Sequence, residues 1–234
     1  MTGSLRGAAL CIVLLSVAGA PAAGSSAPSI DGCVRAGPLV RVIRFAAGPG
    51  DELAAAVLGH GSAGVVLANE SDLDLCAWLP FARVLERSGY RVLAFDYGNS
   101  PPSSEVGAAA RELHRLGARR VALVGASEGA KASIVAAART KTGVTAVVSL
   151  SAERYLLDVD VKPWAARLRR PILFVAARDD VYAAADTPTL YRACSAPAKS
   201  LTMVAGSAHG VGLLDGTAGA GVRREIVRFL AKHR

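Results

Sequence analysis

Ser127 is the residue of this sequence whose surroundings most clearly predict chemistry. It lies in Gly125-Ala126-Ser127-Glu128-Gly129, between the apolar run 121–124 and an alanine-rich stretch. A strand, a tight turn and a helix around a G-x-S-x-G pattern place a serine hydroxyl above the end of a sheet, where it can attack an acyl carbonyl. Glycine is needed on both sides because a side chain there would collide with neighbouring backbone. Ser127 is therefore predicted to be a nucleophile.

The elements that must position Ser127 are short apolar runs bounded by Gly and Pro, and amphipathic stretches between them. The first three strands follow one another through turns, and later strands alternate with helices, which predicts an α/β domain whose sheet is mostly parallel and has helices on both faces. No linker or repeat divides residues 38–234. Strands are expected at 39–45, 52–58, 64–68, 91–95, 120–124, 144–150, 171–176 and 200–204, and helices at 76–88, 105–116, 128–139, 163–168, 187–193 and 222–233.

The segment around Ser127 resembles the nucleophile elbow of the α/β-hydrolase superfamily. Over residues 38–234 the chain is similar to a compact serine esterase or a dienelactone-hydrolase-like member. The resemblance implies the α/β-hydrolase fold, with a mostly parallel sheet of eight strands. It also implies that a catalytic acid and a catalytic base follow the nucleophile in that order along the chain.

The resemblance assigns the acid and the base to two loops downstream. The family's acid follows the second strand after the elbow in a Gly-x-x-Asp turn. Here Ala177 stands where Gly is usual, and counting from it selects Asp180, with Asp179 as the alternative. The base follows the next strand, where His209 lies in a short loop before the last helix. The histidines at positions 60, 114 and 233 are expected to be surface residues.

Two backbone amides are expected to form an oxyanion hole. The turn itself supplies the amide of Glu128, the first residue of the following helix. The resemblance places the second donor after the third strand, where relatives usually have His-Gly before the donor residue. This chain has Asn69 at the His position, Glu70 at the Gly position and Ser71 at the donor. Asn69 and Glu70 are therefore expected beside the substrate.

A carboxylate next to a developing oxyanion opposes catalysis unless it points away or is paired with a cation. Arg41 and Arg44 are the candidates for pairing with Glu70. The segment between residues 151 and 171 is too short for a large lid, so an open and shallow pocket is expected, with Tyr155 as a possible lining residue.

The function that these residues predict is a serine hydrolase that cleaves esters of small or soluble acyl substrates through an acyl-enzyme. No cofactor, metal or nucleotide-binding motif is evident in the sequence. Two alternatives stay open. One is a non-catalytic binding protein on the same fold, because of the Asn69-Glu70 departure, and the other is a serine peptidase or acyltransferase with the same triad.

The beginning of the chain is typical of a secretory signal peptide, with one basic residue, an apolar run and small residues near position 22. Residues 1–22 are interpreted as this signal, residues 23–37 as a flexible leader, and the protein as secreted. No apolar run reaches membrane-spanning length. Removing the signal lowers the formal charge from +8 to +7 and leaves three cysteines, hence at most one internal disulfide, whose partners the sequence does not identify. The basic residues are scattered, which argues against nucleic-acid binding. The oligomeric state is left open.

Overall fold

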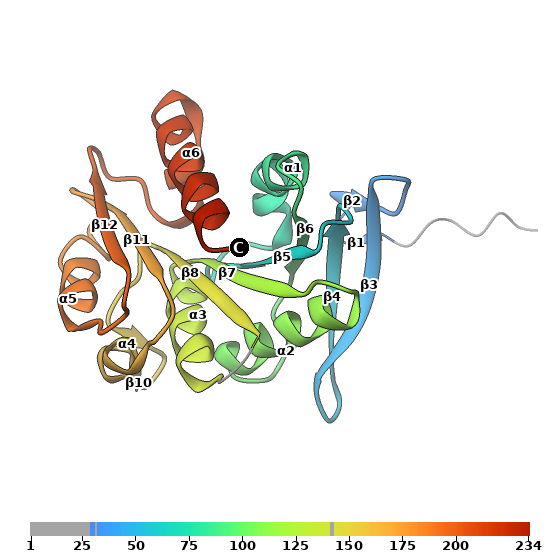
Figure 1. Ribbon diagram of the computed structural model, residues 1–234, viewed down its shortest axis with the longest axis horizontal. Helices are drawn as coiled ribbons and strands as arrows, with labels where there is room; N and C mark the ends of the chain where they lie inside the picture. Colours follow the sequence, from blue (N-terminus) through green and yellow to red (C-terminus); the bar gives the residue numbers. More distant parts are fainter. Residues whose placement is uncertain (1–28, 31, 141–142) are drawn as a thin grey trace, which may run out of the picture.

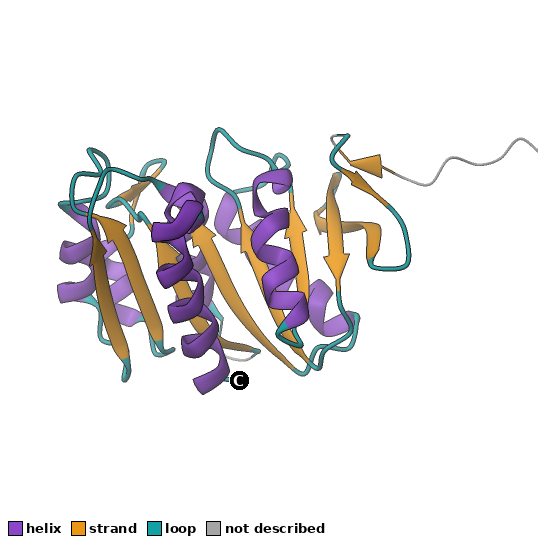
Figure 2. Cartoon of the chain, turned by 90° about the horizontal axis from the view of Figure 1, so that it is seen from above, coloured by secondary structure: helices purple, strands orange, loops and turns teal. Residues whose placement is uncertain are grey.

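A twisted sheet of eight strands forms the centre of the molecule (Figures 1 and 2). The computed structural model describes residues 29, 30, 32–140 and 143–234. The strand order is β12-β11-β8-β7-β5-β6-β4-β3, and only the pairs β3–β4 and β4–β6 are antiparallel. The expected mostly parallel sheet of eight strands is confirmed. The strands are β3 (Val40–Gly48), β4 (Asp51–Leu58), β5 (Ala63–Ala68), β6 (Arg91–Phe95), β7 (Arg120–Ala126), β8 (Val144–Leu150), β11 (Ile172–Ala177) and β12 (Lys199–Val204).

Helices cover both faces of the sheet (Figure 1). One face packs against α2 (Pro102–Arg115), α3 (Glu128–Arg139), α4 (Lys162–Arg167) and α5 (Asp186–Ala193), and the other against α1 (Leu79–Arg87) and α6 (Gly216–Lys232). Each face has its own apolar core, so the central strands are buried on both sides, which explains their nearly continuous apolar sequences. Among the described residues, no helix is both long and apolar enough to cross a membrane.

Helix boundaries differ from the expected ones at glycine and proline. The first helix begins as a 3₁₀ turn, η1 (Leu75–Trp78), before α1, because Pro80 is compatible only with the first turn of an α-helix. The last helix begins at Gly216 and not at residue 222. Its glycine-rich start hid it in the sequence, yet Gly219 has a packing role, since a Cβ there would lie 2.2 Å from the carbonyl carbon of Leu214.

Part of the segment interpreted as a leader has regular structure. β1 (Ser29–Ile30) and β2 (Val34–Arg35) form a small antiparallel hairpin. Ile30 and Val34 are buried in the core that α1 and α6 share, and Cys33 forms a disulfide with Cys76 of η1. Cys194 is a buried free thiol. The interpreted signal peptide, residues 1–22, lies outside the described residues.

Removal of this disulfide is expected to destabilise the protein substantially. The two cysteines are 43 residues apart, and closing a loop of that length stabilises the folded state by about 3 to 4 kcal/mol through the entropy of the unfolded chain. A variant with Cys33→Ser and Cys76→Ser should lose that amount in urea unfolding, and reductant should then have no further effect. Cys194→Ala serves as the control without a cross-link. Unchanged stability of the wild type in reductant would contradict the prediction.

Candidate active site

Ser127 lies at the carboxyl end of β7, in a sharp turn between this strand and α3. Its φ is 46° and its ψ is −109°, a conformation that L-residues rarely adopt. A Cβ on Gly125 would lie 2.1 Å from the carbonyl oxygen of Gly129, and a Cβ on Gly129 would lie 2.1 Å from that of Ala68. Both glycines are therefore required by backbone contacts, as the sequence pattern predicts for such a turn.

Asp180 and His209 follow β11 and β12, which lie beyond β8 in the sheet, and the two residues are in direct contact. The imidazole Nδ1 lies 3.0 Å from Oδ1 and 2.9 Å from Oδ2 of Asp180. Asp180 is buried and also accepts hydrogen bonds from the amides of Tyr182 and Ala183. Asp179 is exposed. An Nδ1–H donated to the carboxylate leaves the Nε2 atom free to accept a proton.

The loop of His209 is fixed by Ser151, a residue that the sequence did not single out. Ser151 is fully buried at the end of β8, with φ of 53°. Its Oγ accepts a hydrogen bond of 3.0 Å from the amide of Gly210. The strained backbone of Ser151 thus directs its hydroxyl toward the neighbouring loop and positions the residue after the imidazole.

Glu153 is the main unpredicted residue of the site. Ser127 Oγ donates to Glu153 Oε1 over 3.3 Å, and the same Oε1 lies 3.9 Å from His209 Nε2. The other oxygen, Oε2, forms an ion pair with Lys131, which lies one helical turn after Ser127. Ser127 and His209 are therefore gathered around one carboxylate oxygen. Only the topology could have revealed this, because Glu153 follows a strand adjacent to β7.

The loop that carries Glu153 is held on both sides of that residue. The Thr187 hydroxyl donates to the carbonyl of Ala152 over 2.8 Å, and Asp186 accepts from the amide of Arg154 over 2.9 Å. The guanidinium of Arg154 in turn pairs with Asp160. These contacts fasten Glu153 to the N-terminus of α5.

Glu70 approaches His209 from the loop after β5. Its side chain is 7% exposed, its Oε1 accepts from the amide of Val211 over 3.1 Å, and its Oε2 lies 4.0 Å from His209 Nε2. The pairing with Arg41 or Arg44 that the sequence offered as a candidate does not occur among the ion pairs of the described residues. Arg44 pairs instead with Glu52, across the β3–β4 hairpin, because β3 is the edge strand of the sheet and lies three strands away from β5.

The other residues expected at the substrate differ in their placement. The Asn69 amide nitrogen donates to the carbonyl of Phe95 and to Asp96, so it ties the loop to the end of β6. Ser71 is exposed on the same loop as Glu70. Tyr155, on β9 (Tyr155–Leu156), is 53% exposed. β9 pairs with β10 (Val159–Asp160) to form a short hairpin beyond Glu153.

Solved structures with the same architecture were found by comparison. An esterase of Pyrococcus furiosus matches with a TM-score of 0.72 and 15% identity, over 82% of this chain and 90% of that one. A dienelactone hydrolase of Anabaena variabilis matches with a TM-score of 0.72 and 17% identity, over 83% and 97%. The esterase domain of a Rhodothermus marinus protein matches with a TM-score of 0.68 and 20% identity, over 83% of this chain and 99% of that one.

This chain has the α/β-hydrolase fold. No protein-family model and no curated protein matches it in sequence. In this fold, ligands bind where the carboxyl ends of parallel strands meet, and here Ser127, Glu153, Asp180 and His209 follow four neighbouring strands of that edge.

Burial makes two carboxylates near the candidate site, those of Glu70 and Glu128, more basic than usual. It raises the pKa of Glu70, against the hydrogen bond from Val211 and the nearby His209. Burial also raises the pKa of Glu128, with Lys131 acting in the opposite direction and Glu153 in the same one. In the parts of the chain that the structure covers, no cluster of three or more His, Cys, Asp or Glu side chains is arranged to hold a metal ion.

Two acidic residues away from the candidate site, Asp51 and Glu105, support the loop between β6 and α2. Asp51 accepts from the amides of Asn99 and Ser100, and the fully buried Glu105 accepts from those of Gly98 and Ser100. The two carboxyl groups influence each other: the neighbouring Asp51 helps to raise the pKa of Glu105, and Glu105 helps to lower that of Asp51. Burial raises the pKa of Glu105 above its ordinary 4.5.

Because this pKa is raised on folding, the contribution of Glu105 to stability is complete below about pH 4.5 and is lost as the pH rises through the higher folded value. Glu105→Gln keeps a donor toward Asp51 and does not titrate. Between pH 5 and 8, wild-type stability is expected to fall relative to this variant, because only the wild type must ionise a carboxyl group that burial disfavours as an anion. Urea unfolding at several pH values measures the difference, and parallel curves for the two proteins would refute it.

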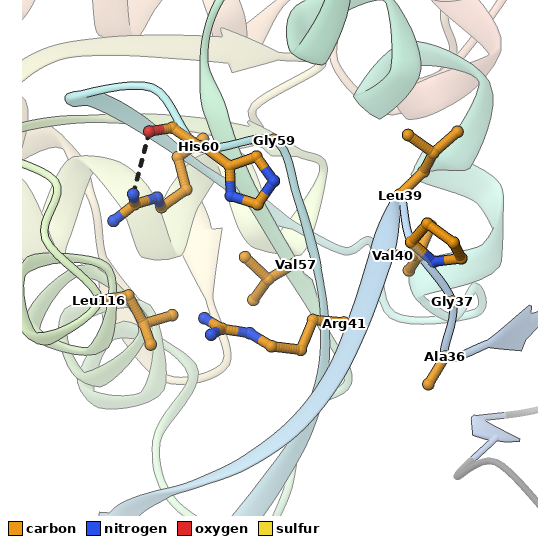
Figure 3. A pocket seen from close by; sticks show the side chains of 11 residues that line it. Ala36, Gly37, Leu39, Val40, Arg41, Val57, Gly59, His60 and Leu116 are labelled. Atoms are coloured by element: carbon orange, nitrogen blue, oxygen red, sulfur yellow. Dashed lines mark hydrogen bonds between the residues drawn. The ribbon is translucent and has the colours of Figure 1, made fainter.

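A hollow on the opposite, amino edge of the sheet is separate from this site. It lies between the start of β3, the turn after β4 and the end of α2 (Figure 3). Arg41 and His60 lie on its walls, and Arg91 Nη2 donates to the carbonyl of His60 over 3.0 Å. These groups are at the other end of the parallel strands from Ser127.

Proposed function

We propose that this chain is a serine hydrolase that cleaves carboxylic esters through an acyl-enzyme. The observation that carries the proposal is that Asp180 holds His209 through Nδ1, while His209 Nε2 and the hydroxyl of Ser127 both face Glu153 Oε1. The imidazole thus presents its second nitrogen on the side where the elbow presents the hydroxyl. The resemblance to esterase folds agrees with this chemistry.

The reaction begins when the Ser127 hydroxyl rotates from Glu153 toward His209 Nε2. His209 takes its proton during attack on the ester carbonyl and returns it to the leaving alcohol. Asp180 fixes the tautomer and stabilises the imidazolium. Water, activated by the same imidazole, then hydrolyses the acyl-enzyme and releases the acid.

The negative oxygen of the tetrahedral intermediate is assigned to the amides of Glu128 and Ser71. Glu128 is the first residue of α3, so its N–H has no acceptor within the helix and is aligned with the helix dipole. Ser71 lies on the loop after β5, two residues beyond Asn69, and the backbone of Ala68 and Asn69 approaches Gly129 at the start of the helix. Removing one such donor typically costs about 2.7 to 4 kcal/mol of transition-state stabilisation.

The substrates are proposed to be small or soluble, and the protein to be secreted. Between β8 and β11, the described chain forms only the β9–β10 hairpin and the six-residue helix α4, which is too little for a large lid. The disulfide of Cys33 and Cys76 supports an oxidising compartment, as the apolar first 22 residues do.

Labelling with a fluorophosphonate tests the nucleophile directly. The reagent should modify one serine, identified by peptide mass spectrometry as Ser127, and Ser127→Ala should abolish both labelling and hydrolysis of a p-nitrophenyl ester. Ser195→Ala, at an exposed serine away from the site, is the matched control. Hydrolysis that survives Ser127→Ala would refute the proposal.

A non-catalytic binding protein is a second candidate. It is favoured by the two carboxylates of Glu70 and Glu153 within about 4 Å of the His209 Nε2 atom, since negative charge there opposes an oxyanion. Folded wild-type protein that fluorophosphonate does not label would favour this candidate. If labelling succeeds, peptide anilides compared with p-nitrophenyl esters distinguish a peptidase from an esterase.

A further inference from the structure

Two carboxylate oxygens from different loops converge on the space in front of the catalytic pair. Glu153 Oε1 lies 3.3 Å from Ser127 Oγ and 3.9 Å from His209 Nε2. Glu70 Oε2 lies 4.0 Å from the same nitrogen. The mechanism proposed above uses neither carboxylate.

Both carboxylates are rigidly held. Glu70 is more than nine-tenths buried, and its Oε2 packs against Gly210, where a Cβ would lie 2.1 Å away. The Val211 amide donates to Oε1, whereas no hydrogen-bond donor among the described residues reaches Oε2. Glu153 has Lys131 on Oε2, and its Oε1 faces Ser127. Each residue therefore directs one oxygen toward the place where substrate must lie.

We propose that this pair of oxygens binds a protonated amine of the substrate, and that the preferred substrates are esters of α-amino acids. The inference rests on the proposed hydrolase function. An ammonium group donates up to three hydrogen bonds, at about 2.7 to 2.9 Å from carboxylate oxygens. Because Glu153 Oε1 lies 3.3 Å from Ser127 Oγ, an amine bound to this oxygen lies close to the carbonyl carbon that Ser127 attacks. An α-amino group, which is two covalent bonds from the carbonyl carbon of its ester, fits this position.

A positive substrate also resolves the electrostatic conflict in the site. A neutral ester would develop its oxyanion near the carboxylates of Glu70 and Glu153, whereas an α-ammonium offsets these charges.

The distribution of charged residues over the fold also favours a positively charged substrate. The loops around the site carry Asp72, Asp74, Asp158 and Asp179, all exposed. The helices end at the opposite edge of the sheet, and each has a basic residue in its last turn: Arg87, Arg115, Arg139, Arg167, Arg192 and Lys232. A chain with a net charge of +8 thus keeps an acidic edge, whose field attracts cations.

Three benzyl esters of similar size test the proposal: the esters of L-alanine, N-acetyl-L-alanine and propionic acid. We expect kcat/KM for the alanine ester to exceed that for the other two by about tenfold or more at pH 6, corresponding to 1.4 kcal/mol or more. The preference should decline as the pH rises and the substrate amine loses its proton, and it should weaken in high salt.

Glu70→Gln and Glu153→Gln should each reduce the ratio of kcat/KM for the charged and acetylated esters. The ratio within one variant is decisive, because a general effect on Ser127 or His209 cancels from it. Glu52→Gln, at an exposed carboxylate paired with Arg44, is the matched control and should leave the ratio unchanged.

Hydrolysis of all three esters with equal efficiency would overturn this inference while leaving the serine hydrolase intact. Failure of fluorophosphonate to label Ser127 would instead overturn the proposed function. If turnover of all three esters is too slow to measure, binding of the amine is tested by whether a ligand slows the reaction of Ser127 with the fluorophosphonate. L-Alaninamide should slow the labelling of Ser127 and its N-acetyl derivative should not; equal protection by both would also overturn the inference.

Discussion

Replacement of His209 by alanine is expected to lower kcat/KM for a reactive ester by about 10⁴-fold, because the nucleophile then has no base to take its proton. The imidazole Nδ1 is hydrogen-bonded to Asp180, and its Nε2 and the Ser127 hydroxyl both lie near the same oxygen of Glu153. Initial rates with a p-nitrophenyl ester measure the effect.

The matched control for His209→Ala is His60→Ala. His60 lies in an exposed turn at the amino edge, and its backbone carbonyl, which the substitution retains, makes its contact with Arg91. The control should keep wild-type rates. Circular dichroism and urea unfolding establish that both variants are folded. A His209→Ala protein that retains more than about a tenth of the activity would remove this imidazole from the mechanism.

Replacement of Gly129 by alanine is the second large effect that we expect. The added Cβ would lie 2.1 Å from the Ala68 oxygen and 2.6 Å from the Asn69 oxygen, both of which are backbone atoms. Neither can yield without moving the end of β5 away from α3. The free energy of unfolding should fall by about 3 kcal/mol or more, and labelling of Ser127 should slow because the Glu128 and Ser71 amides separate.

Gly107→Ala provides a contrast at a glycine within α2. A Cβ there would have only an ordinary contact, 3.6 Å from Arg111 Nη1, and its backbone is helical. This substitution should stabilise the protein by about 0.5 to 1 kcal/mol. Urea unfolding of both variants measures the difference, and similar effects of the two substitutions would contradict the close-approach argument at Gly129.

The secondary structure was largely predictable because each strand of the sheet is a short apolar run with turn residues at its ends. The helix α3 begins and ends where the pattern predicts, at residues 128 and 139. Predictions were less accurate where glycine has a packing role, as at the start of α6, because a glycine-rich segment has little periodicity of its own.

The candidate site was predictable only in part. The elbow is local, so its strand, turn and helix are visible along the chain around Ser127. The contact between Asp180 and His209 was expected from the resemblance, and the structure places these residues together. Glu153 was missed, and the position of Glu70 beside His209 was not foreseen either. The positions of both carboxylates depend on how their side chains are directed from irregular loops. A periodic sequence pattern does not encode that direction.

The sequence by itself determined the order of the main strands and helices along the chain, the turn that carries Ser127 and the glycines that this turn requires. These properties follow from steric limits on a few consecutive residues. Only the tertiary structure decided that Cys33 pairs with Cys76, and that Glu70 and Glu153 meet at His209. The physical reason is that parallel strands bring their carboxyl ends to one edge, so residues far apart in the chain become neighbours through backbone pairing and buried packing.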